Sequence, residues 1–285
     1  MKVGIITMHC VYNYGSALQA SALQRYIEKN FDAEVYIIDY LYPNEYHLSI
    51  VDPNNTPIQK LKHFLRPLKT RIKGERKDSE VRKEMFSMFW NSYFHLTSKK
   101  YISWDEINND KPQFDIYITG SDQVWNPNTM GNDPAYYCMF APLSSTKISF
   151  GASFSISSLS DKDKNVVRKY LSSYKAIGVR EESAKKIVES LTLPSNIEVI
   201  NTCDPTLLLD SSEYHKLAEK SSLYIDGEYI LVYYLQYAYN PNPAMDKVIT
   251  KAEEKFKLPL IFIGEHTYTY KGKHRYINNI GPCEF

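Results

Sequence analysis

The segment Val3-Gly4-Ile5-Ile6-Thr7-Met8 decides the fold, because its almost continuous apolar run has the length of a buried strand. Such runs are typical of parallel sheets, which are covered on both faces. After a loop at 9–15, apolar residues recur at helical spacing from about Ser16, the candidate N-cap. The next apolar run, 34–40 (EVYIIDY), predicts a second strand. This strand–helix–strand unit indicates a Rossmann-like layered architecture.

The same alternation of strands and helices returns further along the chain. In the first part we predict strands at 116–119, 147–152, 176–180 and 198–202, and helices at 161–174 and 182–191. In the second part we predict strands at 229–235 and 258–264, with a helix near 245–256. We therefore predict an α/β protein with two Rossmann-like domains, residues 1–210 and residues 211–285. Because the second domain shows only about two strands, we expect it to be incomplete.

A basic insert of about residues 56–100 interrupts the first domain. Its segment 60–83 is rich in Lys and Arg, with apolar residues interleaved at helical spacing. A basic amphipathic helix can lie on an anionic membrane surface, which would give the protein a peripheral membrane contact. The alternative is a solvated helix face.

Composition excludes several classes of protein. The formal net charge of +1 gives no general attraction to nucleic acid, and no apolar run is long enough to span a membrane. The chain begins directly in a strand, so we expect no signal peptide and a cytoplasmic location. The four cysteines are scattered without the spacing of a zinc site, so we expect no metal.

Four polar loops follow predicted strands: Tyr12–Gln19, Gly120–Asn126, Ser149–Ser153 and Val179–Ser183. The carboxyl ends of parallel strands meet at one edge of a sheet, where ligands bind in open α/β folds. The first loop lacks the G-x-G-x-x-G fingerprint of dinucleotide sites. We expect Gly15 to let the backbone turn sharply into a helix whose N–H groups favour an anion. The small residues of Ser149–Ser153 allow a close approach of backbones.

The loop GSDQVWN (120–126) has two interpretations of equal weight. Ser121 or Asp122 is the N-cap of a short helix and Trp125 a core residue, or the polar side chains form a site. In a site, Asp122 would act as a general acid or base.

Arg180 is the sharpest single candidate, because its guanidinium matches carboxylate or phosphate with two parallel hydrogen bonds. The structural alternative is an ion pair with Glu181, Glu182 or Asp204. His9 and Cys10 are adjacent, but the sequence shows no third group to orient them as a nucleophilic pair.

Five motifs occur in a fixed order: NYGSALQ (13–19), GSDQVWN (120–126), SFGAS (149–153), VREES (179–183) and DPTLLL (204–209). Together they resemble the polysaccharide pyruvyl transferase family. The resemblance implies a GT-B-like arrangement of two Rossmann-like domains. It also implies transfer of a pyruvyl group from phosphoenolpyruvate to a sugar hydroxyl of a cell-surface polysaccharide precursor, which forms a pyruvate ketal and releases phosphate.

The resemblance also implies roles for individual residues. The catalytic residues would be Asp122 and Arg180. Donor binding would fall to Asn13, Gly15, Ser16, Ser153 and Arg180, and acceptor binding to Tyr14, Gln123, Trp125 and Asn126, with Tyr14 and Trp125 stacking on the sugar. No cofactor is needed beyond the phosphoenolpyruvate donor, and no metal.

The implied partners are the donor and a glycan acceptor, which is usually lipid-linked in such pathways. That acceptor would place the protein at the inner face of the membrane. The family's C-terminal domain supplies a Ser-x-x-His-type loop, for which we find no counterpart: His266 and His274 lie in a Tyr- and Lys-rich segment. Two alternatives stay open, namely a GT-B-type glycosyltransferase that uses a nucleotide sugar and an inactive homologue that only binds glycan.

Overall fold

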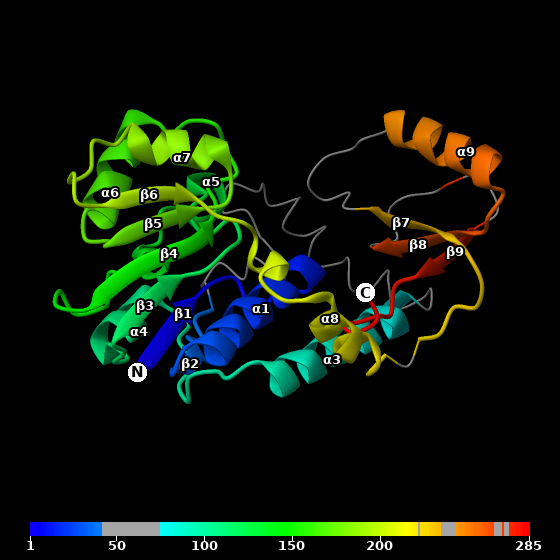
Figure 1. Ribbon diagram of the computed structural model, residues 1–285, viewed down its shortest axis with the longest axis horizontal. Helices are drawn as coiled ribbons and strands as arrows, with labels where there is room; N and C mark the ends of the chain where they lie inside the picture. Colours follow the sequence, from blue (N-terminus) through cyan, green and yellow to red (C-terminus); the bar gives the residue numbers. More distant parts are fainter. Residues whose placement is uncertain (42–74, 222, 235–242, 265–269, 271–273) are drawn as a thin grey trace, which may run out of the picture. The chain divides into compact units, whose positions relative to one another are not determined.

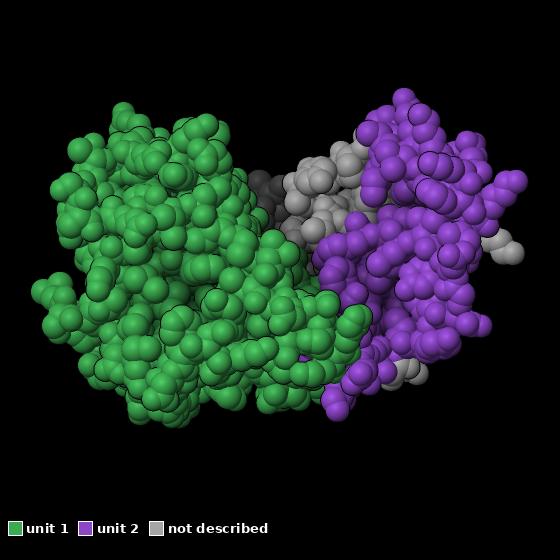
Figure 2. Space-filling model, viewed as in Figure 1, with its two compact units in different colours: residues 1–55, 88–216 green, residues 56–87, 217–285 purple. Residues whose placement is uncertain are grey.

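The computed structural model describes residues 1–41, 75–221, 223–234, 243–264, 270 and 274–285. The chain divides into two compact units, residues 1–55 with 88–216 and residues 56–87 with 217–285 (Figure 2). Each unit is described by itself below. The domain boundary after residue 210 stays a prediction.

Unit 1 is built on a six-stranded sheet in the order β2-β1-β3-β4-β5-β6 (Figure 1). All neighbouring strands are parallel. The strands are β1 (Lys2–Ile6), β2 (Glu34–Ile37), β3 (Ile116–Thr119), β4 (Thr146–Ala152), β5 (Ala176–Val179) and β6 (Glu198–Asn201). The α/β class and the parallel sheet predicted from the apolar runs are therefore confirmed.

Helices connect and cover these strands. Among the described residues they are α1 (Tyr14–Asn30), α4 (Trp104–Asp110), α5 (Pro127–Met130), α6 (Asp161–Leu171) and α7 (Glu182–Glu189), with short 3-10 turns η1 (Pro134–Tyr137) and η2 (Pro205–Leu207). Two further helices, α3 (Glu75–Tyr93) and α8 (Ser211–Ala218), have residues in both units. α1 joins β1 to β2, α6 joins β4 to β5, and α7 joins β5 to β6. These are the crossover connections that parallel neighbours require.

The core of unit 1 explains why its strands are apolar along their whole length. Ile5 belongs to a cluster that packs Leu23 and Ile27 of α1 against the sheet. The next residue, Ile6, belongs to a second cluster with the aromatic residues that follow β3. Successive strand residues point to opposite faces, so both faces bury side chains. Each fully buried aliphatic side chain contributes about 1.5–3 kcal/mol.

Unit 2 holds a three-stranded parallel sheet in the order β7-β8-β9. Its elements are β7 (Ile230–Tyr234), α9 (Ala244–Phe256), β8 (Leu260–Gly264) and β9 (His274–Ile277). Val232, Ile249, Leu260 and Phe262 form its core cluster. The first two strands and the helix were predicted. β9 was not, because its four residues, His-Arg-Tyr-Ile, lie in a segment rich in Tyr and Lys that carries no apolar run.

The predicted basic helix at 60–83 lies outside the described residues as far as residue 74, and residues 75–83 belong to α3. Its membrane contact stays a prediction. Within the part of the chain that the structure describes, no helix is both long enough and apolar enough to cross a bilayer.

Candidate functional site

Loops at the carboxyl edge of the unit 1 sheet bring together Ser16, Ser121, Asp122, Arg180 and Asp204, which we call the carboxyl-edge cluster. Ser16 follows β1, Ser121 and Asp122 follow β3, Arg180 follows β5 and Asp204 follows β6. The side-chain contacts that link them span 24 to 106 residues of sequence. Parallel pairing of the strands therefore creates the cluster, as expected for this edge.

Arg180 is held by three neighbours. Its Nε donates to Glu181 Oε1 at 2.8 Å, and its Nη1 donates to Asp204 Oδ2 at 3.0 Å and Ser121 Oγ at 3.3 Å. Both ion pairs that the structural alternative named, to Glu181 and Asp204, are present. The side chain is 27% exposed, and Nη2 makes no hydrogen bond to the described residues. One edge of the guanidinium is therefore fixed by the protein while the other is unengaged.

The charge of Arg180 is secured by its surroundings. Burial by itself lowers the pKa of this guanidinium, but the carboxylates of Glu181, Asp122 and Asp204 outweigh it, so the pKa is raised. Glu181 bonds through Oε1, whereas its buried Oε2 has no hydrogen-bond partner among the described residues. An unpartnered buried carboxylate oxygen is costly and is suited to accepting a hydrogen bond from a ligand.

Asp122 has an unusual backbone conformation, with φ at 84°. Its carbonyl accepts a hydrogen bond from the Ser153 N–H at 3.0 Å, and its backbone bridges that of Ala152. Its Oδ1 accepts from the Gln123 N–H at 2.8 Å, and its Oδ2 accepts the hydroxyl hydrogen bond of Ser16. The left-handed region costs a non-glycine residue about 1–2 kcal/mol. The contacts to Ser153 and Ser16 therefore hold the Asp122 carboxylate in one place.

The helix-cap interpretation of Ser121 and Asp122 is wrong. The cap of α5 is Asn126, whose Oδ1 accepts from the Asn128 N–H at 3.0 Å. Ser121 instead has a fully buried side chain whose hydroxyl donates to Asp204 Oδ2 at 3.2 Å.

Gly151 makes room for Ser121. A Cβ at Gly151 would lie 3.2 Å from both Cβ and Oγ of Ser121 and 3.3 Å from the backbone carbonyl oxygen of Cys203, and the φ of Gly151 is +71°. The close backbone approach predicted for Ser149–Ser153 is therefore confirmed. Ser153 itself is fully buried, and its Oγ accepts from the Ser155 N–H at 3.0 Å. It supports the loop of Asp122, and its burial leaves it no access to a donor.

The two aromatic residues predicted to stack on a sugar are core residues. Trp125 is fully buried, and its ring stacks on Tyr137 with centroids 5.4 Å apart and planes 6° apart. Its Nε1 donates to the Tyr136 carbonyl at 3.1 Å. Tyr14 is only 1% exposed. The acceptor roles of Tyr14 and Trp125 were wrong because their ring faces are covered by protein.

The other predicted acceptor residues flank this core. Asn126 is buried and donates through Nδ2 to Gln123 Oε1 at 3.3 Å. Gln123 is half-buried and next to Asp122, so of the four predicted acceptor residues it keeps the most exposed position.

The start of α1 differs from its prediction. Asn13, not Ser16, is the N-cap, and its side chain accepts from the Ser16 N–H at 3.1 Å. This contact occupies the Ser16 N–H that was expected to bind an anion. Gly15 is exposed in the first turn of α1, and its φ lies outside the positive range, so the sharp turn attributed to it was wrong. The Gly15 N–H makes no hydrogen bond to the described residues.

The sequence missed Thr7 and Gln19 as supports of the cluster. Thr7 Oγ1 donates to the Ser121 carbonyl at 2.7 Å, and Gln19 Nε2 donates to Thr7 Oγ1 at 3.0 Å. No sequence pattern marks such a buried chain of contacts. Asp204 was missed in the list of site residues although it opens the DPTLLL motif. Its Oδ1 accepts from the Thr206 N–H at 3.0 Å, which leaves Oδ2 for Arg180 and Ser121.

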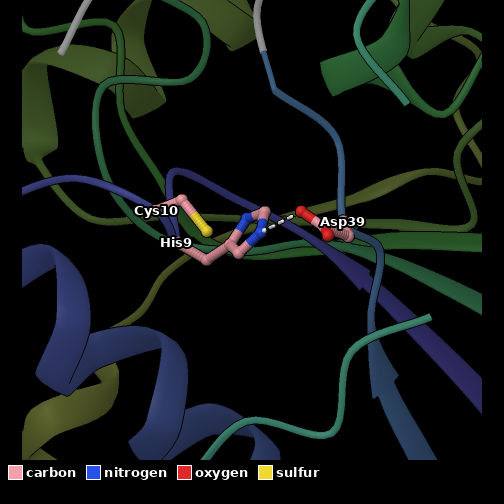
Figure 3. A group of neighbouring side chains, drawn as sticks. All are labelled: His9, Cys10 and Asp39. Atoms are coloured by element: carbon pink, nitrogen blue, oxygen red, sulfur yellow. Dashed lines mark hydrogen bonds and ion pairs between the residues drawn. The ribbon is translucent and has the colours of Figure 1, made fainter. Parts of the chain in front are cut away.

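A second group of side chains joins His9 and Cys10 to Asp39 (Figure 3). His9 is 1% exposed, and its Nε2 lies 3.2 Å from Asp39 Oδ1 while its Nδ1 lies 3.2 Å from the Thr7 carbonyl oxygen. Burial by itself lowers the pKa of His9, but Cys10 and Asp39 outweigh it and raise the pKa to about 10. The expectation that no third group accompanies His9 and Cys10 was wrong, because Asp39 follows the neighbouring strand.

The parallel six-stranded sheet and the polar cluster at its carboxyl edge define an α/β protein with a ligand-site arrangement of that class. A family model described as "Polysaccharide pyruvyl transferase" matches residues 13–280. The chain therefore belongs to the polysaccharide pyruvyl transferase family, a family named for transferase activity. This confirms the resemblance that the five ordered motifs carry.

Comparison with other known proteins adds little. No curated protein matches the chain. A solved structure that resembles it is the UDP-GlcNAc 2-epimerase from Methanocaldococcus jannaschii, with 15% sequence identity and a TM-score of 0.44. The similarity covers 93% of this chain and 66% of the epimerase chain.

Proposed function

We propose that the protein transfers a pyruvyl group from phosphoenolpyruvate to a sugar hydroxyl of a polysaccharide precursor, forming a pyruvate ketal. Family membership supports the reaction class, and the carboxyl-edge cluster supports its location in unit 1. The observation that carries the proposal is the state of Arg180, which is charged, fixed along one edge and unengaged at Nη2.

The donor carries a carboxylate and a phosphate, and a guanidinium binds either group through charge-assisted hydrogen bonds. Glu181 and Asp204 hold the Arg180 fork in place, so little side-chain entropy is lost when it binds. The cluster contains more carboxylates than guanidinium groups, so a donor with two anionic groups needs further positive charge. The family resemblance assigns that charge to the C-terminal domain.

Asp122 is the proposed acid–base group. Ketal formation requires that the oxygens of two sugar hydroxyls bond to C2 of the donor and that the bond from C2 to the phosphate oxygen breaks. One hydroxyl proton moves to the methylene carbon, and the other leaves with the phosphate. A carboxylate held by the Ser16 hydroxyl and the Gln123 N–H is positioned to accept a hydroxyl proton. Because Asp122 also acts electrostatically on Arg180, acceptor and donor would meet between these two side chains.

The acceptor has suitable partners nearby. Sugar hydroxyls donate hydrogen bonds, and the carboxylate of Glu181, whose side chain is 36% exposed, is an acceptor. The half-buried side chain of Gln123 offers further polar atoms. We assign acceptor contacts to Gln123 and Glu181 in place of the buried Tyr14 and Trp125.

Ligand-induced thermal stabilisation of the purified chain tests the donor. Binding to the folded state raises the melting temperature by mass action. We expect phosphoenolpyruvate to raise it, and UDP-sugars or GDP-sugars to leave it unchanged. Stabilisation by a nucleotide sugar instead would support the glycosyltransferase alternative and overturn the proposal.

The role of Arg180 has a matched control. Arg180→Lys keeps the charge but loses the planar fork. The apparent affinity for phosphoenolpyruvate, measured from the shift in melting temperature, should therefore fall at least about tenfold. Arg168→Lys is the control, because Arg168 lies on α6 and donates to the Leu191 carbonyl. Equal donor binding by both variants would remove Arg180 from the donor site.

The acceptor is proposed to be lipid-linked, so the protein would act at the cytoplasmic face of a membrane with segment 60–83 in contact with it. Co-sedimentation with anionic liposomes tests this. Neutralising Lys69, Arg71 and Lys73 should abolish co-sedimentation, and binding that persists would rule out this contact.

A further inference from the structure

His9, Cys10 and Asp39 gather beside the edge where β1 and β2 end. β1 ends at Ile6 and β2 at Ile37, and the two strands are parallel neighbours with Ile5 opposite Ile37. The loop after β1 therefore meets the residues after β2, although Asp39 is 30 residues from His9. One ligand atom from each of the three residues lies within 4.8 Å of the other two (Figure 3).

The three ligand atoms are close together, with the His9 ring between Cys10 and Asp39 (Figure 3). In a Cys–His–Asp relay the imidazole stands between sulfur and carboxylate, each bonded to a different ring nitrogen. Here the Cys10 sulfur is within 4.8 Å of the Asp39 oxygen as well as of a His9 nitrogen. The second ring nitrogen, Nδ1, faces the Thr7 carbonyl at 3.2 Å. The sulfur and the carboxylate oxygen are thus also within reach of each other, as two ligands of one ion must be.

Each buried ligand is held from outside this group of three. A histidine that binds metal through one ring nitrogen usually donates the other N–H to a carbonyl or a carboxylate, and the Thr7 carbonyl is in place for this. The Asp39 N–H donates to Thr97 Oγ1 at 3.0 Å, and the ammonium of Lys100 lies 3.9 Å from Asp39 Oδ2. These contacts orient the ring and leave Oδ1 directed at His9.

We propose that His9, Cys10 and Asp39 bind a divalent transition-metal ion of the zinc class. Nitrogen, thiolate sulfur and carboxylate oxygen are the ligands that Zn²⁺ takes, and three protein ligands leave a fourth position for water. A thiolate and a carboxylate together neutralise a divalent ion. That balance suits a place where His9 and Asp39 are 1% and 5% exposed.

The site is separate from the proposed transferase chemistry. No step of pyruvyl transfer above is assigned to these residues, so the role of the metal would be structural, in the loop between β1 and α1. Thr7, whose carbonyl faces His9, also donates through its hydroxyl to the Ser121 carbonyl. A bound ion would fix the loop between β1 and α1 and, through Thr7, support the carboxyl-edge cluster.

Cobalt titration tests the site without any assay of activity. The full-length, reduced and chelator-treated protein is titrated with Co²⁺, which substitutes for Zn²⁺ and gives a thiolate-to-metal charge-transfer band. We expect one Co²⁺ per chain, the charge-transfer band, and loss of the band when Zn²⁺ is added. Absence of stoichiometric uptake would overturn the proposal.

Variants identify the ligands. Cys10→Ser should abolish the charge-transfer band, and Asp39→Asn should weaken binding at least about tenfold. Cys203→Ser is the control, because it removes a free, half-buried cysteine outside this group of three. Because Asp39 is buried, its variant is compared only where its circular dichroism and melting match the parent. A band that survives Cys10→Ser, or that is lost in Cys203→Ser, assigns the metal elsewhere and rejects the site.

Discussion

Ser16 donates its hydroxyl hydrogen bond to the carboxylate of Asp122, which lies 106 residues later in the chain. Ser16 is in the first turn of α1, and Asp122 follows β3. The contact joins the start of α1 to the loop after β3 and fixes one oxygen of the carboxylate, while the Gln123 N–H fixes the other. Asp122 is therefore both a structural and a chemical residue, and variants must separate the two roles.

Asp122→Asn separates them. Asn tolerates positive φ as Asp does, and its side-chain carbonyl can still accept from Ser16. Its amide nitrogen cannot accept from the Gln123 N–H, so the fold should be retained with a small loss of stability. The proposed base is lost, so the rate of phosphate release from phosphoenolpyruvate with acceptor should fall by about 10²–10⁴-fold. Steady-state kinetics and thermal melting check both parts.

Asp122→Ala is the contrasting variant. It loses the carboxylate and both side-chain contacts, and Ala at φ 84° adds strain of about 1–2 kcal/mol. We expect a lower melting temperature together with the loss of activity. Normal turnover in Asp122→Asn would show that Asp122 is structural only.

Gly151→Ala should disturb the carboxyl-edge cluster by crowding Ser121. The new Cβ would lie 3.2 Å from the Ser121 hydroxyl oxygen, and the alanine backbone would have to adopt a φ of +71°. Strain of about 1–2 kcal/mol is expected, and Ser121 should shift away from Arg180 and Asp204. Urea unfolding measures the loss of stability, and phosphoenolpyruvate titration measures the loss of donor affinity. Gly227→Ala is the matched control, because Gly227 also has positive φ, at +77°, but nothing lies within 4 Å of its Cβ. Equal donor affinity in both variants would mean that Ser121 does not position Arg180.

Most of the fold could be predicted from sequence because buried parallel strands are apolar on both faces. Val3–Met8 and the run at 116–119 gave strands close to their observed bounds. The start of α1 was missed because Asn13 and Ser16 are both good N-caps, and only the backbone conformation of Asn13 decides between them. β9 was missed because a four-residue strand with His274 and Arg275 carries no periodic signal.

The site was predicted as a set of loops, but not as a set of contacts. Position after a strand identified Asp122 and Arg180, because the rule about carboxyl ends depends only on strand order. The direction of a side chain depends on tertiary packing, so Trp125 was assigned to a sugar although it lies in the core. The pairing of His9 with Asp39 follows from the register of β1 and β2, which cannot be deduced from the sequence.

Trp125→Phe tests the core role directly. Phe keeps the stacking position against Tyr137 but loses the hydrogen bond to the Tyr136 carbonyl and part of the buried area. We expect a loss of about 1–3 kcal/mol in the free energy of unfolding, with the KM for acceptor unchanged. Gln123→Ala is the converse variant, with little loss of stability and a raised KM. A raised KM in Trp125→Phe at full stability would restore its sugar-binding role.

The buried Lys147 predicts how the stability of the protein changes with pH. It lies in β4 and is 2% exposed, and burial lowers the pKa of its ammonium group below the usual 10.5, partly opposed by Cys138. The unfolded chain thus holds this proton more tightly than the folded chain. As pH rises toward 10.5, the unfolded state loses that advantage and the free energy of unfolding of the parent increases.

Lys147→Met removes the buried charge and keeps the length of the side chain. Burial of the charged group costs free energy in the folded state, so the variant should be more stable than the parent at pH 7. The difference in the free energy of unfolding should shrink at pH 10, because the parent becomes more stable as pH rises toward 10.5. Urea unfolding at the two pH values measures it. Lys175→Met, at an exposed position whose N–H donates to the Lys147 carbonyl, should show no such change with pH. A Lys147→Met protein less stable than the parent at both pH values would mean that the ammonium group stabilises the fold through its contacts.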